Sequence, residues 1–342
     1  VLYKVTPTST ASGCEGAPFT ITATVNPNAS LEPIQDQTIC SQSSFDDISL
    51  SSPTQPTSQI RYEWEVTSAG SSLSGYTQNS GLDNISNPIS GEIIANASNN
   101  AEDIEYTVTP YIGNCPGTPQ TFTVSVLPTP EVLDANQSIC SNETFSFIPV
   151  NGGGFNGNDI IPNNTTYTWS VESNPNITGE SDQTIAQDEI SQNLVNATNI
   201  SQDVVYTITP LSSNGCDGNP FDLTITVEPK PDIDNKIVGT CSGESLLVNP
   251  SNNIPQEIVP TNTLYTWTIL TGQSDLGDLT GYSDQTVGVS EISQNITNLS
   301  DETKTITYKV IPESGACSGE AFQIKVNISP KPIIENLTAS PI

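Results

Sequence analysis

The chain repeats itself at an interval of about 100 residues. A Tyr-x-Val/Ile-x-Pro motif occurs four times, and a Cys-x-Gly motif follows each tyrosine after nine to eleven residues. A fixed period of this length is typical of a repeat array, in which each repeat is one structural unit. The four tyrosines are Tyr3, Tyr106, Tyr206 and Tyr308, and the four cysteines are Cys14, Cys115, Cys216 and Cys317.

The first half of the unit repeats in register with the second. A Cys-Ser pair occurs at Cys40, Cys140 and Cys241, and each pair precedes a Tyr-x-Trp motif. Pro-x-Pro closes three units, and proline ends strand pairing because it lacks a backbone donor. We therefore predict three full repeats and two partial ones. Their ranges are 1–32 (the closing hairpin of an upstream repeat), 33–130, 131–231, 232–332 and 333–342 (the start of a following repeat).

Within each unit the apolar period is two, as in a half-buried antiparallel strand. Phe122, Val124 and Val126 alternate with polar residues, and Phe221 to Val227 repeats the pattern. Short strands, turn-rich spacers and one tryptophan in about 100 residues are typical of an immunoglobulin-like sandwich. The sequence thus predicts an all-β fold of tandem immunoglobulin-like repeats, arranged as an extended array.

The repeated aromatic residues are the predicted core. We expect each tryptophan to fill the centre of a sandwich, with an exposed sugar-stacking platform as the rival role. Each tyrosine opens the penultimate strand, where a tyrosine corner is expected. The predicted structural core residues are Trp64, Trp169, Trp267, Tyr106, Tyr206 and Tyr308.

An Asn-x-Ser/Thr triplet stands ten residues before each of the last three tyrosines, at Asn96, Asn196 and Asn298. These asparagines are either glycan sequons or turn residues that bond the local backbone. The turn role is favoured, because asparagine is so frequent in this chain.

Six cysteines form early and late pairs separated by 75, 76 and 76 residues. We expect one disulfide in each repeat, and therefore an exported protein, because such bonds persist in oxidising surroundings. The expected pairs are Cys40–Cys115, Cys140–Cys216 and Cys241–Cys317. In a sandwich, however, the early and late cysteines lie at opposite poles. The alternatives are therefore Cys40–Cys216 with Cys140–Cys317, or free thiols.

The charge balance and residue types exclude several functions. Thirty-eight acidic residues face eight basic ones, a net charge of −30, which opposes binding to nucleic acids and to anionic membranes. The absence of histidine removes the commonest general base and imidazole metal ligand. No apolar run is long enough to span a membrane. We predict no catalytic site, no metal site and no cofactor. The chain opens inside a repeat, so we expect it to be an internal piece of a longer protein.

So acidic a chain attracts cations, and calcium is the candidate ion because it binds oxygen ligands. Asp134, Asp232 and Asp234 lie just past Pro-x-Pro, but they stand at different distances from the next cysteine. We therefore expect no obligatory calcium at the linkers. A glycine-rich loop at 151–159 is the candidate glycan or calcium site, and only the second full repeat contains it.

The combined motifs resemble the PKD-like repeats of giant cell-surface adhesins of gliding bacteria. The matching elements are Cys-Ser, Tyr-x-Trp, Asn-x-Thr, Tyr-Thr-x-Thr-Pro, Asn-Gly-Cys-x-Gly and Val-x-Pro-x-Pro. The Gly-Asp-Gly turn of true PKD domains is absent. The resemblance implies type IX secretion, a place on the bacterial surface, and a role in adhesion or gliding motility.

The sequence therefore predicts a structural stalk segment of an extracellular adhesin or filament that is not an enzyme. Its expected partners are neighbouring repeats of the same chain, and surface glycans or other cell-surface proteins. The alternative function is an extracellular module that binds glycan or calcium.

Overall fold

The structure is a computed structural model that describes residues 1–54, 60–78, 89–154 and 157–332. The segment 333–342, expected to start a further repeat, lies outside the described residues. Strands dominate the described chain, which confirms the predicted all-β class. Within the same ranges, no helix has the length and apolar character needed to cross a bilayer.

The partial repeat at the N-terminus contains one antiparallel hairpin. Its two strands, β1 (Leu2–Val5) and β2 (Phe19–Thr22), pair with Val5 opposite Phe19. The side chains of β2 are exposed, so this hairpin has no packed core of its own.

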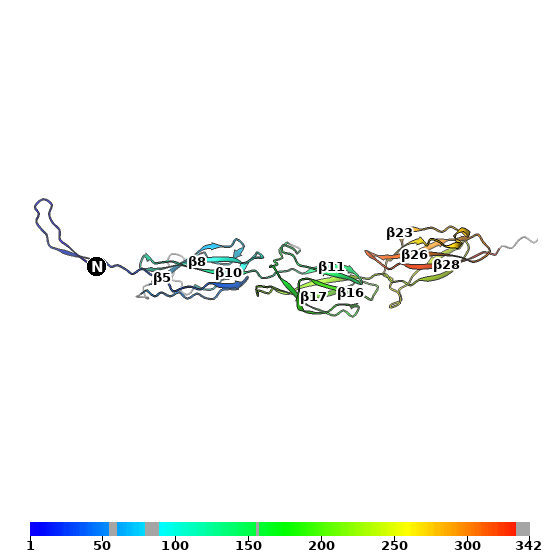
Figure 1. The fold of residues 1–342 in the computed structure, drawn as a ribbon, viewed down its shortest axis with the longest axis horizontal. Helices are drawn as coiled ribbons and strands as arrows, with labels where there is room; N and C mark the ends of the chain where they lie inside the picture. The colour runs from blue at the N-terminus through cyan, green and yellow to red at the C-terminus, as the bar shows by residue number, and fades with distance from the viewer. Residues whose placement is uncertain (55–59, 79–88, 155–156, 333–342) are drawn as a thin grey trace, which may run out of the picture. The chain divides into compact units, whose positions relative to one another are not determined.

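The first full repeat is a sandwich of two sheets (Figure 1). Its strands are β3 (Gln37–Cys40), β4 (Ser43–Ser44), β5 (Ile60–Ala69), β6 (Leu73–Ser74), β7 (Ile93–Asn96), β8 (Glu102–Ile112), β9 (Cys115–Pro116) and β10 (Gln120–Leu127). One sheet has the order β3-β10-β8-β5, with β9 paired to β8, and the other has the order β4-β7-β6. The pairing of β3 with β10 is parallel, whereas the other pairs are antiparallel.

The second full repeat has the same plan. Its strands are β11 (Ala135–Cys140), β12 (Glu143–Phe147), β13 (Thr166–Val171), β14 (Ile177–Thr178), β15 (Gln183–Gln187), β16 (Ile190–Asn196), β17 (Gln202–Leu211) and β18 (Phe221–Glu228). The sheets have the orders β11-β18-β17-β13-β15 and β12-β16-β14, and β11 again runs parallel to β18.

The third full repeat adds a short 3-10 helix. Its elements are β19 (Lys236–Cys241), β20 (Ser245–Val248), β21 (Leu264–Ile269), η2 (Ser274–Asp278), β22 (Leu279–Thr280), β23 (Gln285–Val289), β24 (Ile292–Asn295), β25 (Thr297–Asn298), β26 (Lys304–Ser314), β27 (Cys317–Ser318) and β28 (Phe322–Ser329). The main sheet has the order β19-β28-β26-β21-β23, while β20 pairs with β24 and β22 with β25.

Alternation along the strands gives the first and third repeats cores of their own. In β10, Phe122, Val124 and Val126 point into the first core, while the intervening threonine and serine stay partly exposed. The first core draws its residues from positions 29–126 and the third from positions 233–328. These two sandwiches are therefore stabilised mainly by residues of their own repeats.

The chain forms two compact units. The first comprises Val1–Val132, Val150–Thr165 and Leu211–Asn219, and the second comprises Leu133–Pro149, Thr166–Pro210 and Pro220–Ile342. Two segments of the second repeat thus belong to the same unit as the first repeat. These segments position the site described next.

Candidate functional site: the disulfide junctions

Two disulfides join successive repeats. Cys40 is bonded to Cys216 and Cys140 to Cys317, with Cα–Cα distances of 5.5 and 5.6 Å. Each bond links the early cysteine of one repeat to the late cysteine of the next. Among the described residues, Cys14, Cys115 and Cys241 are free and exposed.

The expected pairs within single repeats, Cys40–Cys115, Cys140–Cys216 and Cys241–Cys317, are therefore wrong. Cys40 ends β3 opposite Leu127, the last residue of β10. Cys115 lies in the hairpin that precedes the other end of β10. Eight residues of strand separate the two cysteines by about 25 Å, whereas a disulfide needs Cα atoms within about 7 Å. The alternative pairing between repeats is the one found.

The early cysteine is held by the serine that follows it. The backbone N–H of Ser41 donates to the carbonyl of Leu127 at 2.8 Å. The Ser41 hydroxyl accepts from the backbone N–H of Asn96 at 2.9 Å and donates to the Asn96 carbonyl at 3.4 Å. Cys40 is thereby fixed at the end of the sheet, next to the linker.

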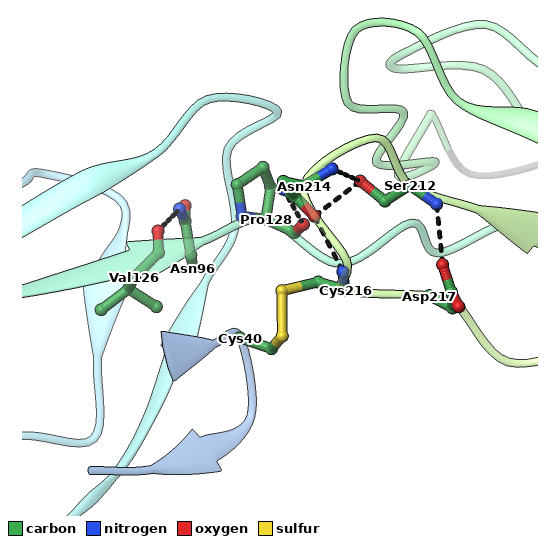
Figure 2. Close-up of a disulfide and its surroundings, with 8 residues drawn as sticks. All are labelled: Cys40, Asn96, Val126, Pro128, Ser212, Asn214, Cys216 and Asp217. Atoms are coloured by element: carbon green, nitrogen blue, oxygen red, sulfur yellow. Dashed lines mark hydrogen bonds between the residues drawn. A yellow bond between two sulfur atoms is a disulfide. The ribbon is translucent and has the colours of Figure 1, made fainter. Parts of the chain in front are cut away.

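The asparagine completes this arrangement, which we call the Ser–Asn lock. The side-chain amide of Asn96 donates to the carbonyl of Val126 at 2.9 Å (Figure 2). The same amide donates to the carbonyl of Asn100 at 2.8 Å, and the side-chain oxygen accepts from the N–H of Ser98. The side chain is buried, so the turn role is correct and the sequon role is excluded for this asparagine.

The same lock recurs in all three full repeats. Asn196 donates to the carbonyl of Val227, and Asn298 to that of Ile328, both at 2.9 Å. The backbone N–H of each asparagine donates to a buried serine hydroxyl at 2.9 Å. The members of the three locks are Ser41 with Asn96, Ser141 with Asn196, and Ser242 with Asn298.

The late cysteine is presented by a tight hairpin. Asn214 accepts through Oδ1 from the N–H of Cys216 at 2.9 Å, and its amide donates to the carbonyl of Pro128 at 3.2 Å (Figure 2). Ser212 donates its backbone N–H to the carboxylate of Asp217 at 3.0 Å. Gly215 turns the chain with a φ of +84°, a value that favours glycine. The hairpin thus binds the Pro-x-Pro linker as well as Cys40.

The glycine of Cys-x-Gly is required because the backbone of another segment lies close to its Cα. The N–H of Gly319 donates to the carbonyl of Pro312 at 2.8 Å, and Gly117 does the same to Pro110 at 2.7 Å. A Cβ on Gly319 would lie 2.3 Å from the carbonyl oxygen of Pro231, which real Cβ atoms do not approach. The motif therefore packs each hairpin against the linker that opens its own repeat.

The tryptophans lie inside the sandwiches. Trp64, Trp169 and Trp267 are between 4% and 9% exposed, which disfavours a role as a sugar-stacking platform. The indole N–H of Trp169 donates to the carbonyl of Ser181, and that of Trp267 to the carbonyl of Ser283, both at 3.1 Å.

The tyrosines are buried near the middle of their strands, and the expected tyrosine corner is wrong. Tyr206 donates its hydroxyl to the side chain of Gln192 at 2.9 Å, instead of to nearby backbone. The hydroxyls of Tyr106 and Tyr308 meet no hydrogen-bond partner among the described residues. Burial raises the pKa of Tyr106, Tyr206 and Tyr308 well above the usual value.

In each full repeat, one polar side chain just before the first strand accepts a backbone N–H. Asp134 accepts the N–H of Asp222 at 2.8 Å, and in the same way Asp36 accepts from Thr123 and Asn235 from Gln323. The sequence analysis compared Asp134 with Asp232 and Asp234, whereas the structurally equivalent residues are Asp36, Asp134 and Asn235. Over the described ranges, no group of three or more histidine, cysteine, aspartate or glutamate side chains converges on a possible metal position.

In the glycine-rich loop, of which residues 151–154 and 157–159 are described, the chain folds against the side chain of Asp159. Asp159 is only 6% exposed, and a Cβ on Gly154 would lie 2.5 Å from its Oδ1. Gly152 donates its N–H to the carbonyl of Asp159 at 2.8 Å. The acidic residue of this loop is directed toward its own backbone and away from solvent.

A family model described as a PKD-like domain matches four segments of the chain, at residues 1–29, 37–130, 137–231 and 238–332. No curated protein matches the sequence.

Similar solved structures include the I67–I69 fragment of the titin I-band, at 9% identity and a TM-score of 0.35, covering 91% of this chain and 100% of that one. The FN1–FN3 domains of chicken CNTN1 match at 11% identity and a TM-score of 0.31, covering 88% and 97%. Cadherin domains 1–5 of protocadherin gamma B2 match at 11% identity and a TM-score of 0.32, covering 86% of this chain but only 58% of that one.

Proposed function

Because this chain belongs to the PKD-like domain family, we propose that it is a non-catalytic structural segment of an extracellular, cell-surface adhesin or filament. The observation that carries the proposal is the pair of disulfides that join successive repeats. Such bonds persist in oxidising surroundings, so they favour an exported protein. In this proposal the repeats form an extended row that serves adhesion or gliding motility after type IX secretion, as the resemblance to surface adhesins of gliding bacteria implies.

The covalent loops closed by the two disulfides overlap. The Cys40–Cys216 loop spans 176 residues and the Cys140–Cys317 loop spans 177, and they share the segment 140–216. Because one disulfide spans each linker, neither repeat junction depends on the linker peptide alone. A cut in the linker at 128–130 leaves the first repeat attached to the second through Cys40 and Cys216.

The same overlap limits how far the chain can extend under tension. A force on the two ends crosses from Cys40 to Cys216, and its shortest route then runs back along the chain to Cys140 and across to Cys317. This route contains about 140 residues and extends to ~50 nm, whereas the reduced chain extends to ~120 nm. A load-bearing segment benefits from this limit, because its repeats stay joined after they unfold.

Single-molecule stretching from the two ends tests the proposal. The oxidised chain is expected to extend to ~50 nm and the reduced chain to ~120 nm at full unfolding. Equal extension in both states would show that no covalent route bypasses the unfolded repeats. The matched control is the Cys14→Ser variant, which removes an exposed thiol outside both loops and should extend as the oxidised chain does.

Small-angle scattering tests the extended row. We expect a maximum dimension several times the cross-section, because each repeat carries its own tryptophan and tyrosine core. A particle with the radius of a 342-residue sphere would rule out the stalk.

A further inference from the structure

We propose that the end of the third repeat around Cys241 is a docking site for the Cys-x-Gly hairpin of another PKD-like repeat, to which Cys241 becomes disulfide-bonded. The inference deepens the proposed function by naming a partner for this segment. It rests on that function only for the oxidising environment in which the bond would form.

Cys241 occupies the same position in its repeat as Cys40 and Cys140, the two early cysteines that are disulfide-bonded. It ends β19 opposite Ser329 of β28, just as Cys140 ends β11 opposite Glu228 of β18. Ser242 donates its N–H to the Ser329 carbonyl at 2.8 Å, and its hydroxyl accepts from the N–H of Asn298 at 2.9 Å. The Ser–Asn lock therefore holds Cys241 in the receiving position with no partner bound.

The surface beside Cys241 is uncovered, unlike its counterpart in the first repeat. Pro128 and Pro130 are buried, and the Pro128 carbonyl accepts the amide of Asn214. The equivalent residues of the third repeat, Pro330 and Pro332, are half-buried and exposed. The third repeat thus presents the cysteine and the prolines of a junction without a hairpin on them.

The chain also contains an unbonded Cys-x-Gly hairpin, the other partner of such a junction. Cys115 lies in a hairpin of the bonding type, and Gly113 turns that hairpin with a φ of +60°, as Gly315 does beside Cys317 with +58°. Bonded Cys216 and Cys317 are 3% and 2% exposed, whereas Cys115 is exposed. An exposed cysteine in such a hairpin is therefore the partner that we expect at the surface around Cys241. Cys115 of a second copy of this chain can serve as that partner in an experiment.

The bond forms by thiol–disulfide exchange with a small disulfide such as oxidised glutathione. The Cys241 thiolate attacks the glutathione disulfide, which forms a mixed disulfide and releases one reduced glutathione. The thiolate of the hairpin cysteine then displaces the second glutathione. Two protein thiols are oxidised, and one oxidised glutathione is reduced to two thiols.

The test uses the full chain with Cys14→Ser, which leaves Cys115 and Cys241 as the exposed thiols. This variant is incubated with an excess of oxidised over reduced glutathione, and the disulfides of the dimer are mapped by peptide mass spectrometry. Random oxidation would give Cys115–Cys241 bonds about twice as often as either symmetric bond. We expect docking to raise this ratio to about tenfold or more. A random ratio, or a majority of Cys241–Cys241 bonds, would overturn the proposal.

A second variant separates docking from simple thiol reactivity. Ser242→Ala in the same background keeps the Cys241 thiol but removes the hydroxyl that fixes its position. We expect the Cys115–Cys241 ratio to fall toward the random value in this variant, while the total amount of dimer is retained. An unchanged ratio would show that the Ser–Asn lock around Cys241 has no part in the choice of partner cysteine. Either failure leaves the stretching result intact, because that experiment depends only on Cys40–Cys216 and Cys140–Cys317.

Discussion

Asn196 donates its side-chain amide to the carbonyl oxygen of Val227, 2.9 Å away, and to that of Ile200, 2.7 Å away. Val227 lies in β18 and Ile200 in the turn before β17, so one buried amide connects two segments of the same sandwich. The oxygen of the same side chain accepts from Thr198. Nearly every polar atom of Asn196 is therefore engaged inside the protein.

Asn196→Ala is expected to lower the free energy of unfolding by about 2 kcal/mol, because it removes the buried hydrogen bond from the Asn196 amide to the Val227 carbonyl. The measurement is urea denaturation followed by tryptophan fluorescence. Asn193→Ala, at an exposed position on the same strand, is the matched control and should change stability by less than about 0.5 kcal/mol. Equal losses of stability in Asn196→Ala and Asn193→Ala would contradict the role of the Ser–Asn lock.

Gly319→Ala tests the close approach at the second junction. The added Cβ would lie 2.3 Å from the Pro231 carbonyl and 2.8 Å from the Pro312 ring, so we expect a loss of about 2 kcal/mol in unfolding free energy. Gly277→Ala is the control, because its Cβ would meet nothing within 4 Å. That control should leave stability unchanged or raise it by about 0.5 kcal/mol.

A pair of tyrosine variants tests the buried hydroxyls. Tyr308→Phe removes a hydroxyl that is buried without a partner among the described residues, and should keep or raise stability by about 1 kcal/mol. Tyr206→Phe removes a hydrogen bond to Gln192 and should cost about 1 kcal/mol. Thermal unfolding of both variants and of the parent chain measures the change in stability. A larger loss of stability in Tyr308→Phe than in Tyr206→Phe would refute this prediction.

Alkaline pH should destabilise the repeats. Burial raises the pKa of Tyr308 above the usual tyrosine value of 10.0, so the unfolded chain releases this proton at lower pH than the folded one. The contribution of each such tyrosine to the free energy of unfolding is therefore fully present below pH 10. Above pH 10 this free energy falls by about 1.4 kcal/mol per pH unit for each such tyrosine. Urea midpoints between pH 9 and 11 measure the slope. The slope should be shallower in Tyr308→Phe, and parallel slopes would contradict this cause.

The thiol count gives a direct check on the disulfides. Titration of the unfolded, unreduced chain should detect three thiols of seven, at Cys14, Cys115 and Cys241. Peptide mapping should then recover Cys40 joined to Cys216. Recovery of a Cys40–Cys115 peptide would restore pairing within the repeat.

The period of the motifs was sufficient to predict the repeats and the all-β class, because strand alternation and a spacing of about 100 residues depend on local sequence. The residues of the lock were visible as the repeated Cys-Ser and Asn-x-Ser/Thr motifs. Their joint role was not, because Ser141 and Asn196 are 55 residues apart and meet only across two sheets.

The disulfide pairing could not be chosen from spacing. Cys140 has one candidate partner 76 residues away in its own repeat and another in the next, and separation along the chain does not rank them. The deciding fact is the parallel register that places Cys140 opposite Glu228, at the end of the sheet farthest from the hairpin of its own repeat. Pairing between the first and last strands of a repeat leaves no local signal in the sequence.

That parallel register also determines how a sandwich resists tension. The linker enters the second repeat before Ala135, which lies opposite Leu223, and the chain leaves after Glu228, which lies opposite Cys140. In the reduced chain, a pull on both ends therefore slides β11 along β18, and the hydrogen bonds between them lie across the direction of the force. They must break together instead of opening one after another, as they would if the two strands were peeled apart. The pairing of first and last strands is thus a shear clamp, and its strength should increase with the number of residues in register.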